Sequence, residues 1–415
     1  MVVSPTRWRR RAEPVDFPAP PCGPAFITGM GRSNPTRLST MSDATRGVIP
    51  WDALRAARHQ WRRFRHRRAL SRTQVSVPPN GIHVSYGNVL SHGAAESVRG
   101  GRVKLLHLRE VFPESPAAFN VLYLVSSAQP PFVDELARWA RGRGIKVVWN
   151  QDGVAYPAWA GREADGLNAT MRAAMRQAHY VLYQSQFCRT SAARFIGACA
   201  TPSEVLPNCV DIRRFRPAVP PAPEEPWTLL AAGSHQHRSR VLRAIEVVAE
   251  LRRRGRAARL LVAGVLDWAD ADAEVARIVK ALGVGGSVQV LPPYTQQEAP
   301  ELFQRAHVLL HLKYKDPCPT VVIEALACGL PVVGSRSGGL PELVGNDAGI
   351  LLDVPESWEH LHVPDSGAAA DAVTSIMRDH ARWCAAARRR AEDRYAREPW
   401  LARHRAIFHH LLGRD

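Results

Sequence analysis

Two acidic residues, Asp316 and Glu324, flank the expected start of a helix in the stretch KDPCPTVVIEALACGLPVVGSRSGGLPE, residues 315–342. Two prolines favour a turn after the first acid, and the apolar run behind them predicts a helix that begins near Thr320 and Val321. Free backbone N–H groups and the positive end of the helix dipole favour an anion such as phosphate there. Glu324 lies about one turn further in, within reach of a ligand docked at that helix end.

The glycine pair Gly338-Gly339 follows a short β-branched segment that predicts a buried strand. Because glycine has no Cβ, this backbone can approach a bound group closely. Together with the two acids, the pair suits an anionic ligand that carries hydroxyls, such as a sugar nucleotide. The same residues also fit an ordinary α/β unit in which Glu324 is a solvated helix acid, and the spacing alone does not separate the two interpretations.

The stretch resembles the donor-binding segment of the retaining glycosyltransferases of the GT-B fold, family 4 type. That family has a Glu-x7-Glu pair, an E-A-x-A-x-G-x-P-V-V run from the second acid, and then a Gly-Gly-x-x-Glu turn. The matching residues here are Glu324, Ala325, Ala327, Gly329, Pro331, Val332, Val333, Gly338, Gly339 and Glu342. The first acid departs from the pattern, because Asp316 is one methylene shorter than glutamate.

The resemblance covers roughly residues 81–412 and implies an α/β fold of the GT-B type. Two doubly wound Rossmann-like domains would face each other across a cleft, with C-terminal helices crossing back to the first domain. It implies transfer of a hexose from a nucleoside-diphosphate sugar to a hydroxyl acceptor, with retention of the anomeric configuration. It places Glu324 on the ribose hydroxyls and Asp316 on a sugar hydroxyl, with Gly338 and Gly339 nearby.

Length and composition indicate the class of protein, the number of domains and the cellular compartment. At 415 residues the chain is long enough for two domains, and 46% apolar and 22% charged residues are ordinary for a globular protein. No apolar stretch approaches the length of a membrane span, and no secretory signal is expected. Seven cysteines without a CxxC pair favour a reducing compartment and argue against a disulfide framework or a zinc site. We therefore expect a cytoplasmic protein.

The net charge of the chain is +17, and most of it lies near the N-terminus. Residues 1–72 hold 15 Arg, no Lys and four acids, a net charge of 15 − 4 = +11. Residues 1–50 lack apolar periodicity and are expected to be disordered. Residues 51–72 predict a basic amphipathic helix, with Trp61 and Phe64 among arginines. Such a helix lies on an anionic membrane surface, at the inner face here, or packs on the protein's own body. Nucleic acid is not expected, because the rest of the chain is not strongly basic.

From Gly81 onward strand and helix patterns alternate, which predicts parallel, doubly wound sheets. We expect an N-terminal acceptor domain at 73–215, a donor-binding domain at 216–398 and a crossover helix at 399–415. The expected strands of the first domain are 82–85, 103–108, 121–126, 146–149, 180–183 and 204–206. Those of the second are 228–232, 259–263, 288–291, 308–311, 331–333 and 349–352.

Ligands between such domains lie at the carboxyl ends of the strands, so the loops that follow strands were searched for polar side chains. After the strand 228–232, Gly233 precedes Arg238 and Arg240, which take the place of the Arg and Lys that the resembled family uses on the donor diphosphate. Both also fit solvated arginines at a helix start. Tyr294 lies near the nucleotide base or at a core edge.

Acceptor-side candidates come from the first domain. Asn150, Gln151 and Asp152 follow the strand 146–149, where many relatives have a histidine loop. Asp152 would orient or deprotonate an acceptor hydroxyl, or Asp152-Gly153 is simply a turn. Gly100-Gly101 resembles the family's turn near the diphosphate, although a structural turn is also compatible with it.

No cofactor and no metal ligands are expected, since HExxH is absent and His235 and His237 are poorly spaced for a shared ion. GxSxG, GxxxxGK[ST] and GxGxxG are absent too, so a hydrolase elbow, a P-loop and a dinucleotide dehydrogenase lack support. The alternatives are a noncatalytic sugar-nucleotide-binding protein, or an epimerase or phosphorylase of the same fold.

Overall fold

The computed structural model describes residues 51–88, 100–218 and 224–414. By their internal contacts residues 1–55 and 56–415 form two separate units, and of the first unit only residues 51–55 are described. The extension expected to be disordered, residues 1–50, lies outside the described residues.

Helix α1, Trp51–Arg72, occupies the range expected for the basic helix. Beyond residue 55 one side of it is bound to helix α3, Val133–Arg141. Arg67 Nη2 donates to Glu135 Oε1 over 2.6 Å, and Arg63 bonds both Asp134 and Glu135. The hydrogen bond from Arg67, helped by Arg63, lowers the pKa of Glu135 to about 2. Ion pairs therefore fasten this side of α1 to the N-terminal domain.

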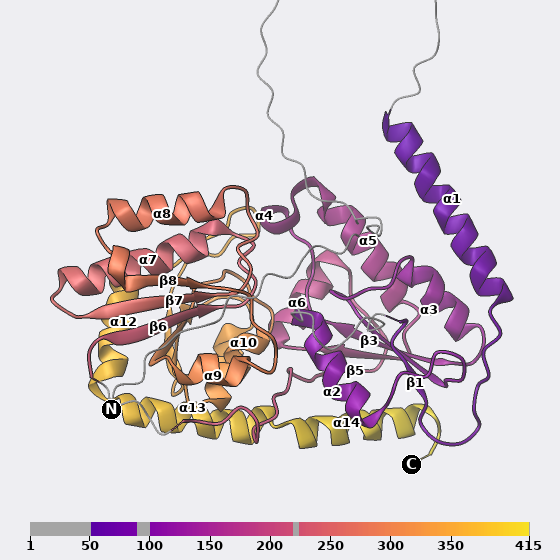
Figure 1. The fold of residues 1–415 in the computed structure, drawn as a ribbon. Helices are drawn as coiled ribbons and strands as arrows, with labels where there is room; N and C mark the ends of the chain where they lie inside the picture. Colours follow the sequence, from indigo (N-terminus) through magenta and orange to yellow (C-terminus); the bar gives the residue numbers. More distant parts are fainter. Residues whose placement is uncertain (1–50, 89–99, 219–223, 415) are drawn as a thin grey trace, which may run out of the picture. The chain divides into compact units, whose positions relative to one another are not determined.

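The N-terminal domain is built on a parallel sheet in the order β1-β2-β3-β4-β5, which follows the chain within the described residues (Figure 1). Its strands are β1 Val84–Ser85, β2 Val121–Val125, β3 Lys146–Gln151, β4 Tyr180–Tyr183 and β5 Ser203–Val205. Its further helices are η1 Gly100–Arg102, α2 Val103–Val111, α4 Pro157–Ala160, η2 Gly161–Glu163, α5 Ala164–Met175 and α6 Gln186–Phe195. Alternate residues of β2 enter two different apolar clusters, so helices cover both faces of the sheet.

The C-terminal domain has a parallel sheet in the order β11-β10-β9-β6-β7-β8. The strands are β6 Trp227–Ala232, β7 Ala258–Ala263, β8 Val288–Leu291, β9 Val308–His311, β10 Val332–Ser335 and β11 Gly349–Leu352. Its helices are α7 Arg238–Arg253, α8 Ala271–Ala281, η3 Gly285–Ser287, α9 Ala299–Gln304, α10 Thr320–Ala327, α11 Leu340–Val344 and α12 Ser366–Arg378. The order reverses between β6 and β9, which is the switch point where such sheets bind ligands.

The segment 103–108, expected as a strand, is instead the first part of helix α2. Val103 and Leu105 alternate with polar residues as in a strand, but Leu105, Leu108 and Val111 also recur at helical spacing. The helix buries Leu105 and Leu108 against the sheet. Strand β3 also runs on to Gln151, beyond the expected end at residue 149.

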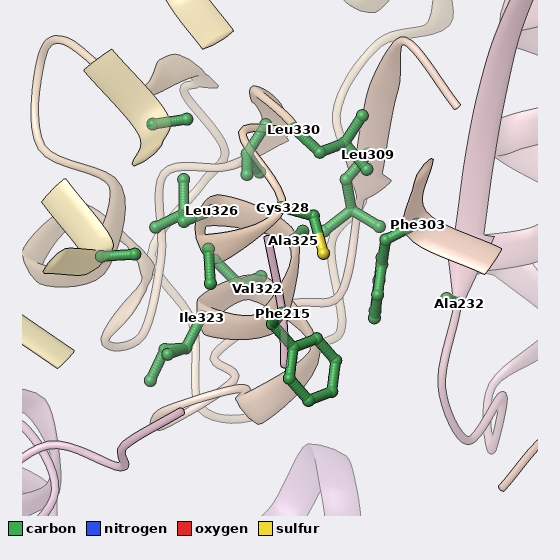
Figure 2. Packing of buried hydrophobic residues seen from close by; sticks show 14 of the residues in the cluster. Phe215, Ala232, Phe303, Leu309, Val322, Ile323, Ala325, Leu326, Cys328 and Leu330 are labelled. Atoms are coloured by element: carbon green, nitrogen blue, oxygen red, sulfur yellow. The ribbon is translucent and has the colours of Figure 1, made fainter. Parts of the chain in front are cut away.

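Helix α10 begins at Thr320, as predicted, and is nearly surrounded by the core of the C-terminal domain (Figure 2). Val322, Ile323 and Leu326 pack in this core together with side chains such as Phe215 and Phe303. Gly329 ends the helix with φ +70°, a conformation that glycine adopts without a Cβ clash. Arg388 Nη1 donates to the carbonyl of Ala327 over 2.6 Å, which stabilises the negative end of the helix. The helix is thus held rigidly with its start at the domain edge.

The expected crossover is confirmed by α13, His380–Tyr395, and α14, Arg397–Leu411, which run from the C-terminal domain to the N-terminal domain in Figure 1. Trp400 and Phe408 of α14 pack with β2 residues, and His404 Nε2 lies 3.1 Å from Tyr123 Oη. None of the described helices is both long and apolar enough to cross a bilayer.

Candidate active site

A cavity of about 760 Å³ is lined by residues of both domains. Its wall follows the carboxyl ends of strands, with Ser126 after β2, Asp152 after β3, Gly233 after β6 and Lys313 after β9. The predicted residues that line it are Gly100, Gly101, Asp152, Gly233, Arg240, Tyr294, Asp316, Thr320, Val321 and Glu324. Arg238, Gly338, Gly339, Asn150 and Gln151 are not among its lining residues.

The start of α10 opens into this cavity through Thr320 and Val321. Its N-cap is Pro319, whose side chain makes no cap hydrogen bond, so the first-turn N–H groups have no capping side chain. Asn208 Nδ2 donates to the Cys318 carbonyl over 2.9 Å and to Thr320 Oγ1 over 3.3 Å, which fixes the turn before the helix. A helix start held in this way suits an anionic ligand.

Glu324 lies one turn behind that helix start and is only 3% exposed. Its Oε1 accepts a hydrogen bond of 3.0 Å from Gln296 Nε2. Burial raises the pKa of Glu324 to about 7, although Gln296 and the charge of Arg214 oppose the shift. A buried carboxylate that lines a cavity and has spare lone pairs is an acceptor for ligand hydroxyls.

Asp316 faces the same cavity beside a histidine and a lysine. Its Oδ2 lies 3.2 Å from both His311 Nε2 and Lys313 Nζ. Burial alone would raise the pKa of Asp316, but Lys313 and His311 outweigh it and lower the pKa. Burial lowers the pKa of His311 to about 4, so the neutral ring donates from Nε2. Asp316 is therefore a carboxylate at neutral pH.

One of the two expected arginines lines the cavity and the other does not. Arg240 lines the cavity and is held by the carbonyls of Ala232 and Ser234, at 2.5 and 3.2 Å. Arg238 instead pairs with Glu274, and its side chain is 67% exposed. Lys313 lines the cavity and was missed by the sequence reasoning; its signal was its place directly after the strand that ends at His311.

The glycine pair packs against residues 315–317, the loop that carries Asp316 and is called the acidic loop below, and does not line the cavity. A Cβ on Gly338 would lie 2.4 Å from the Asp316 carbonyl, and one on Gly339 would lie 1.9 Å from the Pro317 carbonyl. Gly339 N also donates to the Asp316 carbonyl over 2.9 Å. The close approach expected of these glycines is thus made to residues 316–317, and their contact with a ligand stays a prediction.

Substituting Gly339→Ala should displace the Asp316–Pro317 turn, because its φ of −86° is normal and only the steric clash acts. We expect a stability loss of about 1–3 kcal/mol, typical of overpacking, and weaker ligand binding. Thermal unfolding of Gly339→Ala and Gly166→Ala checks this, since a Cβ at Gly166 in α5 meets nothing within 4 Å. Equal melting temperatures for the two variants would contradict the role of Gly339.

Asp152 is bound by several donors of the N-terminal domain. Lys104 Nζ lies 3.1 Å from Oδ2, and Ser126 and Ser127 donate to the carboxylate over 2.5 Å each. A Cβ on Gly101 would lie 2.1 Å from Ser127 Oγ, so a larger residue there would make the Ser127 side chain move. Asp152 thus lies at the cavity with Lys104, Ser126 and Ser127 bound to its carboxyl group. Lys104 was missed, because its segment was predicted as a strand.

Asn150 and Gln151 lie in strand β3 and not in the expected loop. Asn150 accepts from Lys104 and Gln184 and donates to Tyr123 Oη over 2.9 Å. Gln151 accepts from Trp149 Nε1 over 2.7 Å. Both are buried, and Asn150 bonds the same Lys104 ammonium that pairs with Asp152. Within the described residues, no three His, Cys, Asp or Glu side chains gather as metal ligands.

Comparison with known proteins agrees with this geometry. The family model "Glycosyl transferases group 1" matches residues 213–391, which include α10 and the acidic loop. Among solved structures, sucrose-phosphate synthase from Thermosynechococcus elongatus superposes with a TM-score of 0.59 at 17% identity, covering 72% of this chain and 75% of that one. Anabaena HepE in complex with UDP gives a TM-score of 0.58 at 16% identity, covering 74% and 80%.

Curated relatives match over shorter segments. A D-inositol 3-phosphate glycosyltransferase of Salinispora tropica is 34% identical over 25% of this chain and 23% of its own length. The N-acetyl-alpha-D-glucosaminyl L-malate synthase of Bacillus anthracis is 27% identical over 34% and 35%. The matched segments thus span about a quarter to a third of these relatives. The chain is thus similar to glycosyl transferases group 1 over residues 213–391, and its two parallel-sheet domains form a GT-B fold.

Proposed function

We propose that this chain is a retaining glycosyltransferase that moves a hexose from a nucleoside-diphosphate sugar to a hydroxyl acceptor. The bond between the anomeric carbon and the diphosphate oxygen breaks, and a bond from that carbon to the acceptor oxygen forms on the same face. The acceptor proton passes to the departing phosphate. The observation that carries the proposal is the start of α10 in the cavity, with Glu324 one turn behind it.

Charge on the leaving diphosphate is the main physical obstacle to this reaction. The N–H groups at Thr320 and Val321, with Lys313 and Arg240, supply preorganised positive potential in one cavity. These groups would stabilise the diphosphate without a metal ion, and we include metal independence in the proposal. Anabaena HepE forms complexes with UDP and with UDP-glucose, which supports a nucleotide-sugar donor here.

Glu324 would bind the ribose of the donor, and Asp316 would bind its hexose. An ionised Glu324 can accept from both ribose hydroxyls, and these bonds would favour its carboxylate against the effect of burial. Asp316, already ionised beside Lys313, would accept from a sugar hydroxyl. Asp152, which pairs with Lys104, would bind an acceptor hydroxyl.

The test is to incubate the protein with UDP-, GDP- and ADP-hexoses and candidate acceptors, and to read the anomeric proton of the product by NMR. A product with the donor's anomeric configuration is expected. Donor binding without any turnover would favour the noncatalytic sugar-nucleotide-binding protein, for which the shortened acid Asp316 is the motivating observation. An epimerised or phosphorolysed donor would favour the other enzyme classes.

We also propose that the outward side of α1 contacts an anionic membrane. Opposite the residues bound to α3, Arg58, Trp61, Arg65 and Arg68 recur at helical spacing. Trp61 and Phe64 are 58% and 60% exposed, and the Arg65 guanidinium lies 4.7 Å from the Trp61 ring centroid. Exposed aromatic rings among arginines suit an interface of anionic headgroups and acyl chains.

Replacing Trp61 and Phe64 by serine should weaken binding to vesicles that contain phosphatidylglycerol by about tenfold, because exposed apolar area is lost. Co-sedimentation of the full chain and of this double variant measures the effect, with phosphatidylcholine vesicles as the control. Equal sedimentation of both proteins, or equal binding to both lipids, would exclude this contact.

A further inference from the structure

One wall of the cavity is formed by apolar side chains of the N-terminal domain. Between residues 154 and 171 its lining consists of Val154, Tyr156, Trp159, Leu167 and Met171, and none of these is charged. Leu361 and Val363, from the loop after β11, extend the apolar lining from the C-terminal domain. The site therefore has a hydrocarbon surface in addition to its ionic groups.

Two members of this wall are open to solvent. Trp159 in α4 is 43% exposed and Leu167 in α5 is 42% exposed, whereas Tyr156 and Met171 are buried. Leu167 and Met171 are four residues apart and so lie on one side of α5. The Ala158 amide donates to the Trp358 carbonyl of the other domain, which holds α4 at the domain boundary. Both side chains also line the cavity, so a ligand in it can cover them.

The arginine, the lysines and the acidic side chains that line the cavity come from other elements. Arg240 belongs to α7, Lys313 and Asp316 to the loop after β9, and Lys104 to α2. The diphosphate and ribose of the proposed donor would be satisfied by those residues and by α10. The apolar wall of α4 and α5 is therefore left for the other substrate.

We infer that this wall binds the hydrocarbon chain of an amphiphilic acceptor, which leaves the cavity over Trp159 and Leu167. The inference rests on the proposed function and names its acceptor class. A free sugar or another compact polar acceptor would leave both exposed side chains in water, whereas an alkyl chain would cover them. The exposed aromatic residues of α1 agree with an acceptor of this kind, since they suit the surface in which such molecules reside.

Calorimetric titration of the full chain with methyl, butyl, octyl and phenyl β-D-glucosides, below their micelle concentrations, tests the inference. Each methylene buried on the wall should lower Kd about fourfold, so octyl should bind at least about tenfold tighter than butyl. The double variant Trp159→Ser with Leu167→Ser should lose this dependence on chain length. Leu282→Ser, which removes an exposed leucine at the end of α8, should retain it.

Chain-length dependence that persists in the double variant would overturn the inference, as would octyl glucoside that does not bind or binds no tighter than butyl. Phenyl glucoside binding as tightly as octyl would replace the extended chain with a compact aromatic group and would also overturn it. Titration of the same samples with UDP, GDP and ADP separates failure of this inference from failure of the proposed function. Nucleotide binding without alkyl binding removes only this inference, and alkyl binding without nucleotide binding removes the proposed function.

Discussion

Glu324→Gln should weaken binding of the donor nucleotide by about 10- to 100-fold, because a neutral amide would replace the carboxylate that we propose accepts two ribose hydroxyls. The effect should depend on pH. Burial raises the pKa of Glu324 to about 7, so the wild type gains donor affinity as pH rises through 7 and the carboxyl ionises. The variant should show no such gain. Calorimetry at pH 6 and pH 8 measures both effects.

The same variant should be more stable than the wild type above neutral pH. The pKa of Glu324 is about 7 in the folded protein against an ordinary value of 4.5, so its ionisation costs the folded state up to about 3 kcal/mol at pH 8. Below pH 4.5 the carboxyl is neutral in both states and this difference disappears. Thermal unfolding at pH 4, where the two proteins should be about equally stable, and at pH 8 measures this difference. Unchanged nucleotide affinity, or a variant less stable at pH 8, would contradict this role of Glu324.

Lys313→Gln should lower kcat about 100-fold while the protein stays folded, because the cavity loses a cation that we propose stabilises the leaving diphosphate. The side chain is 30% exposed, so little packing is lost with it. Loss of Lys313 should also raise the pKa of Asp316, which Lys313 helps to keep low against burial. Turnover of the identified donor, measured with saturating acceptor, gives the comparison.

Arg238→Gln is the matched control for Lys313→Gln. Both variants remove one positive charge from a segment that follows a strand of the C-terminal domain, β6 for Arg238 and β9 for Lys313. Arg238, however, pairs with Glu274 and does not line the cavity. Its kcat should stay within about twofold of the wild type, as for a solvated ion pair. A large loss in Arg238→Gln together with a normal Lys313→Gln would reverse the assignment and restore the sequence-based choice.

Local patterns made parts of this site predictable. The start of α10, Glu324 and the stop at Gly329 lie within ten consecutive residues, where capping, helical period and glycine geometry act over short range. Asp316 could be placed for the same reason. The two-domain architecture followed from the alternation of strands and helices, which needs no knowledge of tertiary contacts.

The parts that were missed depend on contacts between distant segments. Lys104 reaches Asp152 only because its segment is a helix, and packing of Leu105 and Leu108 on the sheet decides that. Asn150 and Gln151 are poor strand formers, yet they continue β3 because their amides are satisfied by Tyr123, Gln184 and Trp149. The choice between Arg238 and Arg240 depended on which side of α7 faces the cavity, and the uncertain start of that helix concealed it.

The most direct test of the central claim is calorimetric titration of the full chain with UDP, GDP and ADP and then with their sugar conjugates, with and without EDTA. We predict that one nucleotide binds, that EDTA does not change its Kd, and that Glu324→Gln weakens it. That result would show a metal-independent donor site at the start of α10. Failure of all three nucleotides and their conjugates to bind would contradict a nucleotide-sugar donor and with it the proposed reaction.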